Sequence, residues 1–325
     1  MTSAAVAPRD RTANWTHRLK DVSFWAEWAA AVGLVLLVVV FQILNPTFLS
    51  SGNIASMLVA AAILIILAVG QTFVVATGGI DLSVASIMTF GAVSFGQAYS
   101  HGWGLLWSCV VAVVAGGLAG AINGIVIARG KITDFIVTLG MLSAASGAAL
   151  IFADGKPVTV IDSFLLKLST GGIGVFGWTV IIAAVVALVA HGFLFWTRFG
   201  THVLATGGSP EAATATGIST ARIKIAVYTV SGLLAGLAAI LLVARVGAAE
   251  PASNTSFLLN SVAAVVLGGV SLLGGRGTIT GPVIGALLLT ALTNGLTLLG
   301  VSQFYQPLAV GFVVVLAALL TRFQK

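Results

Sequence analysis

The sequence predicts an all-α protein: a polytopic transmembrane helix bundle with about ten spanning helices. Of its 325 residues, 58% are hydrophobic and only 7% are charged, and the mean hydropathy is +1.11. A soluble domain carries about 25% charged residues. One water-soluble core could not hide so much apolar surface, so the lipid bilayer is the expected solvent for most of the chain.

Ten runs of mostly apolar residues are long enough to be spanning helices. In chain order they are 26–44, 54–77, 84–101, 103–128, 134–153, 173–196, 222–246, 257–274, 279–299 and 304–321. Residues 1–25 are polar and basic, and the run that follows shows no clear cleavage site, so they are expected to form a cytoplasmic N-terminal tail. Residues 26–325 then form one transmembrane domain, in which the short connections 78–83 and 274–278 predict tight hairpins.

The basic residues support this count and give the orientation. When the N-terminus is placed in the cytoplasm and the runs alternate, all but three of the 15 Lys and Arg residues fall on the cytoplasmic side. The exceptions are Lys156, Lys167 and Arg245. Such a bias is the signature of membrane topology, and a miscounted helix would destroy it. The sequence therefore predicts that both termini are cytoplasmic, and it explains the net charge of +6 without nucleic acid as a partner.

Small residues recur at helical spacing in three of the runs. They are Gly116, Gly120 and Gly124, then Gly232 and Gly236, then Gly281 and Gly285. In lipid, helices associate through close approach of their backbones, which small residues permit. These repeats predict a tightly packed bundle and are better explained by packing than by a direct ligand role.

Polar side chains inside the apolar runs are the candidates for a substrate pathway, because lipid offers them no hydrogen-bond partner. The candidates are Gln71, Asp81, Asn123, Asn260, Thr290 and Asn294. A path lined by hydroxyl and amide groups suits a neutral, polyhydroxylated solute. Hydrogen bonding between helices would explain the same residues. For Asp81, the alternative is a capping role at the start of a helix.

Several other functions have little support in the sequence. The centres of the predicted helices hold almost no ionisable residues, whereas carriers coupled to protons or sodium usually need them. No Gly-Lys pair is followed by Ser or Thr, as a phosphate-binding loop requires, and we find neither a credible catalytic triad nor a His/Cys cluster with metal-ligand spacing. The chain is therefore expected not to be an enzyme and to hold no cofactor or metal of its own.

The longest predicted cytoplasmic connection, about 197–222, contains a short helical pattern. Glu211, Ala212 and Ala213 form a good helical start, and Gly217 stands where a short helix would end. A short helix placed in a cytoplasmic loop between two groups of spanning helices is well suited to docking another protein.

The Glu211-Ala212-Ala213 pattern, with Gly217 behind it, resembles the ATPase-docking loop of binding-protein-dependent ABC importer permeases. Longer matches are residues 45–54, residues 78–86 reading GGIDLSVAS, and residues 263–277 reading AAVVLGGVSLLGGRG. Together they resemble the permeases of the ribose, xylose and galactoside class. The docking loop departs from the broader importer pattern because no Leu-Pro follows at the usual distance.

The resemblance implies that the chain is the membrane-spanning permease subunit of an ATP-driven importer in the bacterial inner membrane. It would move a monosaccharide, a pentose or a hexose, by alternating access. The implied partners are a second, identical or similar permease chain, a periplasmic sugar-binding protein and a cytoplasmic ABC ATPase that binds ATP and Mg. Glu211, Ala212, Ala213 and Gly217 would form the coupling helix.

Two alternatives remain open. The solute could be a branched-chain amino acid or a furanosyl signal molecule. The chain could also be a self-sufficient secondary carrier, which the sparse charge in the predicted helices disfavours. The sequence does not name the sugar, and it does not decide whether the second permease chain is identical.

Overall fold

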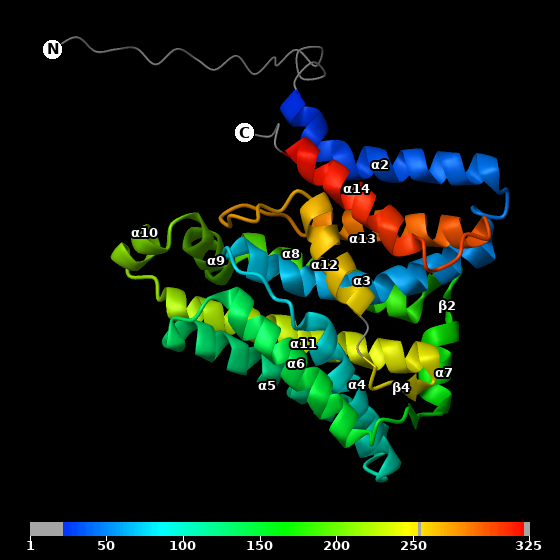
Figure 1. The fold of residues 1–325 in the computed structure, drawn as a ribbon, viewed down its shortest axis with the longest axis horizontal. Helices are drawn as coiled ribbons and strands as arrows, with labels where there is room; N and C mark the ends of the chain where they lie inside the picture. Colours follow the sequence, from blue (N-terminus) through cyan, green and yellow to red (C-terminus); the bar gives the residue numbers. More distant parts are fainter. Residues whose placement is uncertain (1–21, 253–254, 322–325) are drawn as a thin grey trace.

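The computed structural model describes residues 22–252 and 255–321 as a bundle of helices (Figure 1). Most of the predicted N-terminal tail, and the C-terminal Arg322 and Lys325, lie outside these residues. The long helices are α2 (Val22–Leu44), α3 (Ser51–Ala76), α4 (Val84–Ser100), α5 (Gly104–Gly130), α6 (Asp134–Phe152), α8 (Trp178–Trp196), α11 (Thr220–Val246), α12 (Thr255–Leu267), α13 (Thr280–Leu298) and α14 (Gln306–Thr321).

Shorter elements connect them. Helix α7 (Ser163–Thr170) lies between α6 and α8, and α9 (Arg198–Gly208) and α10 (Pro210–Ala215) lie between α8 and α11. Strand β1 (Val158–Thr159) pairs antiparallel with β4 (Ala248–Ala249), and β2 (Gly172–Ile173) pairs with β3 (Phe176–Gly177). The protein is thus helical apart from these two small two-stranded sheets, as far as the described residues go.

Each of the ten predicted apolar runs contains a helix, and six of these helices are long and apolar enough to cross a membrane. The six are α3, α5, α6, α8, α11 and α13. They make the chain a polytopic helical membrane protein. The total of ten spans stays a prediction, because α4 and α12 have only 17 and 13 residues. At 1.5 Å per residue, α12 is about 20 Å long, less than the ~30 Å of a hydrocarbon core.

The predicted helix 257–274 is wrong in its second part. Helix α12 ends at Leu267, and the chain continues without helix to α13. The cause is a set of glycines whose backbone the α conformation does not fit: Gly269, Gly274 and Gly275 have φ values of +73°, +82° and +76°. Apolar composition alone did not reveal this break.

The predicted tight hairpin at 78–83 is also wrong, because this segment enters the bundle. Figure 1 shows the chain leaving α3 near the left of the view and beginning α4 only near the middle. We call residues Thr77–Ser83 the re-entrant loop. The side chains of Asp81 and Ser83 are completely buried, whereas Gly78 and Ile80 are exposed, so the end of the loop that leads into α4 lies inside protein.

Helices α5 and α11 pack through the predicted glycines. A Cβ atom on Gly116 or Gly232 would collide with the backbone of the other helix, and one on Gly236 would meet the carbonyl of Ala112. Gly285 lies equally close to the backbone of Ala264, which joins α13 to α12. The prediction that these small residues serve close packing is confirmed.

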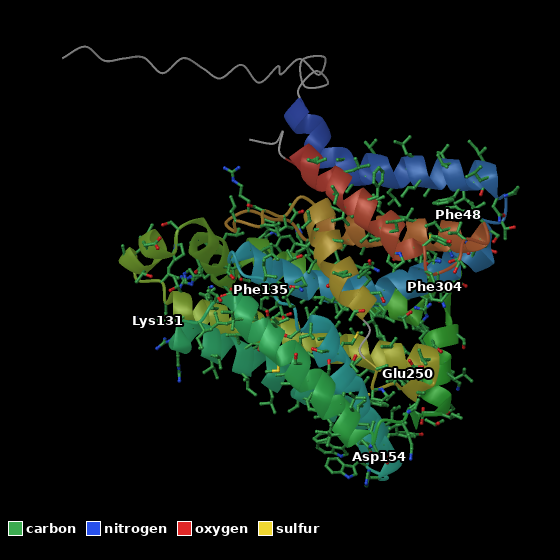
Figure 2. All side chains as sticks on the ribbon, viewed as in Figure 1. Phe48, Lys131, Phe135, Asp154, Glu250 and Phe304 are labelled. Atoms are coloured by element: carbon green, nitrogen blue, oxygen red, sulfur yellow. The ribbon has the colours of Figure 1, made fainter. Side chains whose placement is uncertain are left out.

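The connections gather at two ends of the bundle. Figure 2 shows Lys131 at one end, and Asp154, Glu250 and Phe304 toward the other. Helices α9 and α10 lie at the Lys131 end (Figure 1). The predicted cytoplasmic and outer loops therefore separate in space as the sequence requires. That the Lys131 end faces the cytoplasm, with both termini, stays a prediction.

Replacing Gly120 tests the packing of α5 on α11. A Cβ atom there would collide with the carbonyl oxygen of Tyr228, a backbone atom that cannot turn away. We expect Gly120→Ala to destabilise the protein by about 1–3 kcal/mol, the usual range for overpacking. Thermal unfolding of the detergent-purified protein measures this. Gly140→Ala on α6 is the matched control, since no atom lies within 4 Å of its new Cβ. Equal unfolding temperatures for the two variants would contradict the close contact.

Candidate functional site

A buried polar cluster surrounds Asp81 at the point where the re-entrant loop meets α4. One carboxylate oxygen, Oδ1, accepts hydrogen bonds from the backbone N–H of Ser83 at 2.9 Å and from its hydroxyl at 2.6 Å. The other, Oδ2, accepts from the hydroxyl of Ser231 on α11 at 3.2 Å. All three side chains are buried. Hydrogen bonds to the carboxylate offset part of the cost of removing it from water.

Two amide side chains complete this cluster. The Nε2 of Gln71 on α3 donates to the backbone carbonyl of Asp81 at 2.5 Å, and the Nδ2 of Asn123 on α5 donates to the Ser83 hydroxyl at 2.8 Å. The amide oxygens of Gln71 and Asn123 are buried and have no hydrogen-bond partner among the described residues. Three predicted pathway candidates, Gln71, Asp81 and Asn123, thus come together from α3, the re-entrant loop and α5.

The capping alternative for Asp81 needs a correction. The residue that precedes α4 as its N-cap is Ser83, and Asp81 stands two positions earlier. The carboxylate therefore does not cap the first helical N–H groups, and instead it holds the backbone of the N-cap residue itself. The sequence analysis correctly predicted that Asp81 lies at the entry to a helix, but the N-cap position belongs to Ser83, two residues later.

The other three candidates lie apart from this cluster. Asn294 on α13 forms a reciprocal amide pair with Asn53 on α3, with N–O distances of 2.9 and 3.0 Å. The Thr290 hydroxyl donates to the carbonyl oxygen of Ala286 in its own helix at 2.8 Å, and this side chain makes no hydrogen bond to another helix among the described residues. Asn260 on α12 is half-buried. Whether any of the six candidates lines the path stays a prediction.

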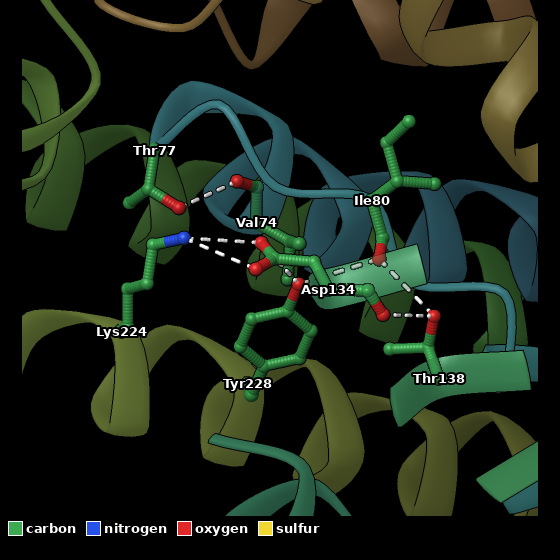
Figure 3. A network of polar contacts seen from close by, with 7 residues as sticks. All are labelled: Val74, Thr77, Ile80, Asp134, Thr138, Lys224 and Tyr228. Atoms are coloured by element: carbon green, nitrogen blue, oxygen red, sulfur yellow. Dashed lines mark hydrogen bonds and ion pairs between the residues drawn. The ribbon is translucent and has the colours of Figure 1, made fainter. Parts of the chain in front are cut away.

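A second polar network holds the re-entrant loop from the Lys131 end, and the sequence analysis did not identify it (Figure 3). Lys224 on α11 forms an ion pair with Asp134, the first residue of α6, at 3.2 Å to each carboxylate oxygen. The Tyr228 hydroxyl lies 2.9 Å from Asp134 Oδ2 and 3.3 Å from the carbonyl oxygen of Ile80. Thr138 also approaches this carbonyl, at 3.3 Å. The sequence did contain a signal for this network, because Asp134 and Lys224 carry opposite charges in a chain with only 7% charged residues.

Helix α10 is the short helix that the sequence predicted. Ser209 is its N-cap and accepts the N–H of Ala212 at 3.2 Å, and Pro210 takes the first helical position. Gly217 follows the helix with φ of +86°, and its N–H donates to Thr214 at 3.0 Å. Ala213 is buried, whereas Glu211 is exposed at the end of the molecule. Helix α10 therefore presents the exposed carboxylate of Glu211, while its buried Ala213 packs against the rest of the protein.

A groove of about 720 Å³ lies between α4, α5 and α6. Its walls are almost entirely apolar and include Phe90, Trp107 and Phe152. Such a lining suits hydrocarbon and does not suit a polyhydroxylated solute, which would lose its hydrogen bonds there. The polar cluster and helix α10 are therefore the features of functional interest.

A buried polar cluster at a re-entrant loop, inside a bundle of apolar helices, is an arrangement found in membrane transporters. The comparison with protein families agrees. Residues 53–320 match the family described as branched-chain amino acid transport system / permease component, and the chain belongs to this family.

The curated relatives include sugar permeases. The chain is 40% identical to the ribose import permease protein RbsC of Bacillus subtilis over 296 residues, which cover 90% of this chain and 91% of the relative. It is 36% identical to the L-arabinose ABC transporter permease protein AraH of Azospirillum brasilense, with 90% and 88% covered. It is 34% identical to the fructose import permease protein FrcC of Rhizobium meliloti, with 89% and 84% covered. No solved structure matches. The predicted resemblance to permeases of ABC sugar importers is confirmed.

Replacing Ser231 tests the cluster around Asp81. Ser231→Ala removes the only side chain that donates to Asp81 Oδ2 within the described residues, and it leaves that oxygen buried. We expect a loss of stability of about 1–3 kcal/mol, the cost of an unsatisfied buried group. Ser143→Ala on α6 is the control, because Ser143 is exposed and bonds only to its own helix. Thermal unfolding of both variants measures the effect. An unchanged Ser231→Ala protein would argue against the cluster.

Proposed function

We propose that this chain is the membrane-spanning permease subunit of an ATP-driven importer that moves a monosaccharide, a pentose or a hexose, across the bacterial inner membrane by alternating access. The observation that carries the proposal is the exposed helix α10, with Glu211, Ala212 and Ala213 in an importer-type docking motif. It stands in a chain similar over 90% of its length to ribose permeases. The relatives' pentose and hexose substrates support the sugar class.

The chemistry of the chain supports an uncharged solute. The candidate pathway residues are amides, hydroxyls and a single carboxylate already engaged by serines. Sugar hydroxyls both donate and accept hydrogen bonds, so amide and hydroxyl side chains can replace their water of hydration. A fixed uncompensated charge would be the expected feature for an ionic solute.

A branched-chain amino acid is the second candidate solute, because the family description itself names such transport. An α-amino acid carries both an ammonium and a carboxylate group, and each needs an oppositely charged or dipolar partner. The relatives that name a substrate here are ribose, arabinose and fructose permeases, which favours the sugar.

The proposed transporter has further subunits. An ABC ATPase, which binds ATP and Mg, would dock at α10 on the cytoplasmic side, and a periplasmic sugar-binding protein would deliver the solute at the opposite end. A second permease chain, identical or similar, would complete the membrane unit. The chemistry of ATP hydrolysis then belongs to the partner, and this chain supplies the path and the docking surface.

Purification of the tagged chain from its own membranes in mild detergent tests the assembly. We expect an ATPase with a phosphate-binding loop to co-purify, and mass spectrometry identifies it. The binding protein encoded with it is then titrated with ribose, arabinose, fructose and leucine. Binding of leucine alone would move the assignment to the amino acid. Recovery of this chain alone, where a known importer stays intact, would favour a self-sufficient carrier.

The docking helix is tested by reversing the charge of Glu211. We expect Glu211→Arg to abolish ATP-coupled uptake and to reduce the recovered ATPase, because the exposed carboxylate is replaced by a longer cation while the helix keeps its cap and its buried Ala213. The amount of permease in the membrane should not change. Glu250→Arg, the same change at the other end of the bundle (Figure 2), should leave ATPase recovery unaltered. Normal uptake by Glu211→Arg would refute the docking role.

Asn294 distinguishes a path residue from a packing residue. We expect Asn294→Leu to slow solute uptake, because it removes a polar side chain and its pair with Asn53, without changing ATPase recovery. Thr293→Val is the control, since the Thr293 hydroxyl bonds only to its own helix. Uptake at the control level by Asn294→Leu would return this residue to packing.

A further inference from the structure

The re-entrant loop and the docking segment are distant in the sequence but are linked at two places, each through residues of a third segment. The docking segment, which we define as residues 207–224, contains the end of α9, helix α10 and the start of α11. One contact lies before α10 and the other after it. A displacement of α10 that carries its flanking residues with it would act on both.

The first contact is made of backbone alone. A Cβ atom on Gly207 would collide with the carbonyl oxygen of Ala76, at the end of α3, and with the N–H of Gly275. That N–H donates to the same Ala76 carbonyl at 3.0 Å. A Cβ on Gly274 would lie 2.7 Å from the nitrogen of Gly78, the second residue of the re-entrant loop. Three chain segments thus meet with no side chain between them.

The second contact is the network of Figure 3. Lys224, in the first turn and a half of α11, pairs with Asp134 at 3.2 Å. The side chains of Lys224 and Asp134 are only 26% and 15% exposed. Loss of one partner would leave the other charge poorly solvated, and the cost of that exceeds the cost of breaking an exposed ion pair. The pair is therefore a firm point of attachment between α11 and α6.

Tyr228 carries this attachment to the loop. Its hydroxyl lies between Asp134 Oδ2 and the carbonyl oxygen of Ile80, at 2.9 and 3.3 Å, and its ring is completely buried. Gly79 packs closely against the same groups: a Cβ atom there would lie 2.5 Å from Asp134 Oδ2 and 2.8 Å from the Tyr228 oxygen. The loop and the network thus fit directly against each other.

Three residues along α11 place these contacts in one row on the same helix face. Lys224, Tyr228 and Ser231 are separated by four and three positions, so they lie on one face of the helix. Lys224 and Tyr228 reach Asp134 and Ile80, and Ser231 reaches the carboxylate of Asp81, the next residue of the loop. A shift of α11 along its axis would pull on consecutive residues of the loop.

We propose that Lys224, Asp134 and Tyr228 are positioning residues that transmit movement of the docking helix α10, through the start of α11, to Ile80 and Asp81 of the re-entrant loop. The proposal rests on the proposed docking of an ATPase at α10. According to this proposal, the re-entrant loop is the segment of this chain that changes position when the ATPase changes state.

The test follows a single cysteine in the loop of the complete transporter. The parent protein for this test carries Cys109→Ser, which removes the one native cysteine, and Ile80→Cys; the Ile80 side chain is 36% exposed. A maleimide then labels the introduced cysteine in the purified complex, without nucleotide and with ATP and vanadate. We expect the two labelling rates to differ by about fivefold or more, as for a coupling free energy of about 1 kcal/mol or above.

The further variants Lys224→Met and Tyr228→Phe should reduce this difference to less than about twofold while the ATPase still co-purifies. Lys131→Met, which removes an exposed lysine at the same end, should keep the full difference. The exchanged pair Lys224→Asp with Asp134→Lys should restore more of it than either single change, which a loss of folding would not allow.

The outcomes separate the two proposals. A parent complex that contains no ATPase would refute the docking function and this inference with it. A parent complex with ATPase whose labelling does not respond to nucleotide would refute the inference alone. So would Lys224→Met and Tyr228→Phe proteins that retain the full response.

Discussion

The fold depends on pairing the polar groups of one non-helical loop inside an apolar bundle. In a bilayer, backbone without a hydrogen-bond partner costs several kcal/mol per group, so irregular chain is tolerated only where protein surrounds it. The re-entrant loop meets this condition. Its Gly79 N–H returns to Val74, its Ile80 carbonyl faces Tyr228 and Thr138, and its Asp81 carbonyl accepts from Gln71.

Close packing of helices makes this pairing possible. The short hydrogen bonds around the loop need α3, α5 and α11 to approach to backbone contact, and a single methyl group at Gly120 would hold α5 and α11 apart. Since apolar side chains gain nothing by leaving lipid for protein, close contacts at small residues and buried hydrogen bonds take the place of the hydrophobic driving force. The hydrogen bonds of the polar cluster therefore depend on the close helix packing that the glycines permit.

The arrangement also suggests how one chain can be both stable and movable. The loop is held by contacts from helices that differ in their neighbours: α3 is mostly buried, whereas α6 is mostly exposed and the start of α11 belongs to the docking segment. Binding at a distant end can bias such an element only if it changes contacts that differ between two states. The contacts of Lys224, Tyr228 and Ser231 along α11 are the ones that such a change would alter.

The sequence by itself determined the class of the protein and most of its helices. Hydropathy, charge bias and glycine spacing are local properties, and they located each of the ten helical runs, the small residues that serve close packing, and helix α10 with its glycine end. Motifs in order along the chain also predicted the family resemblance. None of these required knowing which segments meet.

Only the tertiary structure decided what lies at the re-entrant loop. The segment 78–83 was expected as a surface hairpin because its length allowed one, and its burial follows from partners on α3, α5, α6 and α11 up to 150 positions away. Asp134 and Lys224 were not singled out because they stand near the ends of two predicted runs that are distant in the sequence. The hydrophobic pattern of a segment reflects the environment that the segment faces. The pairing of buried polar groups depends instead on the three-dimensional neighbours that satisfy them.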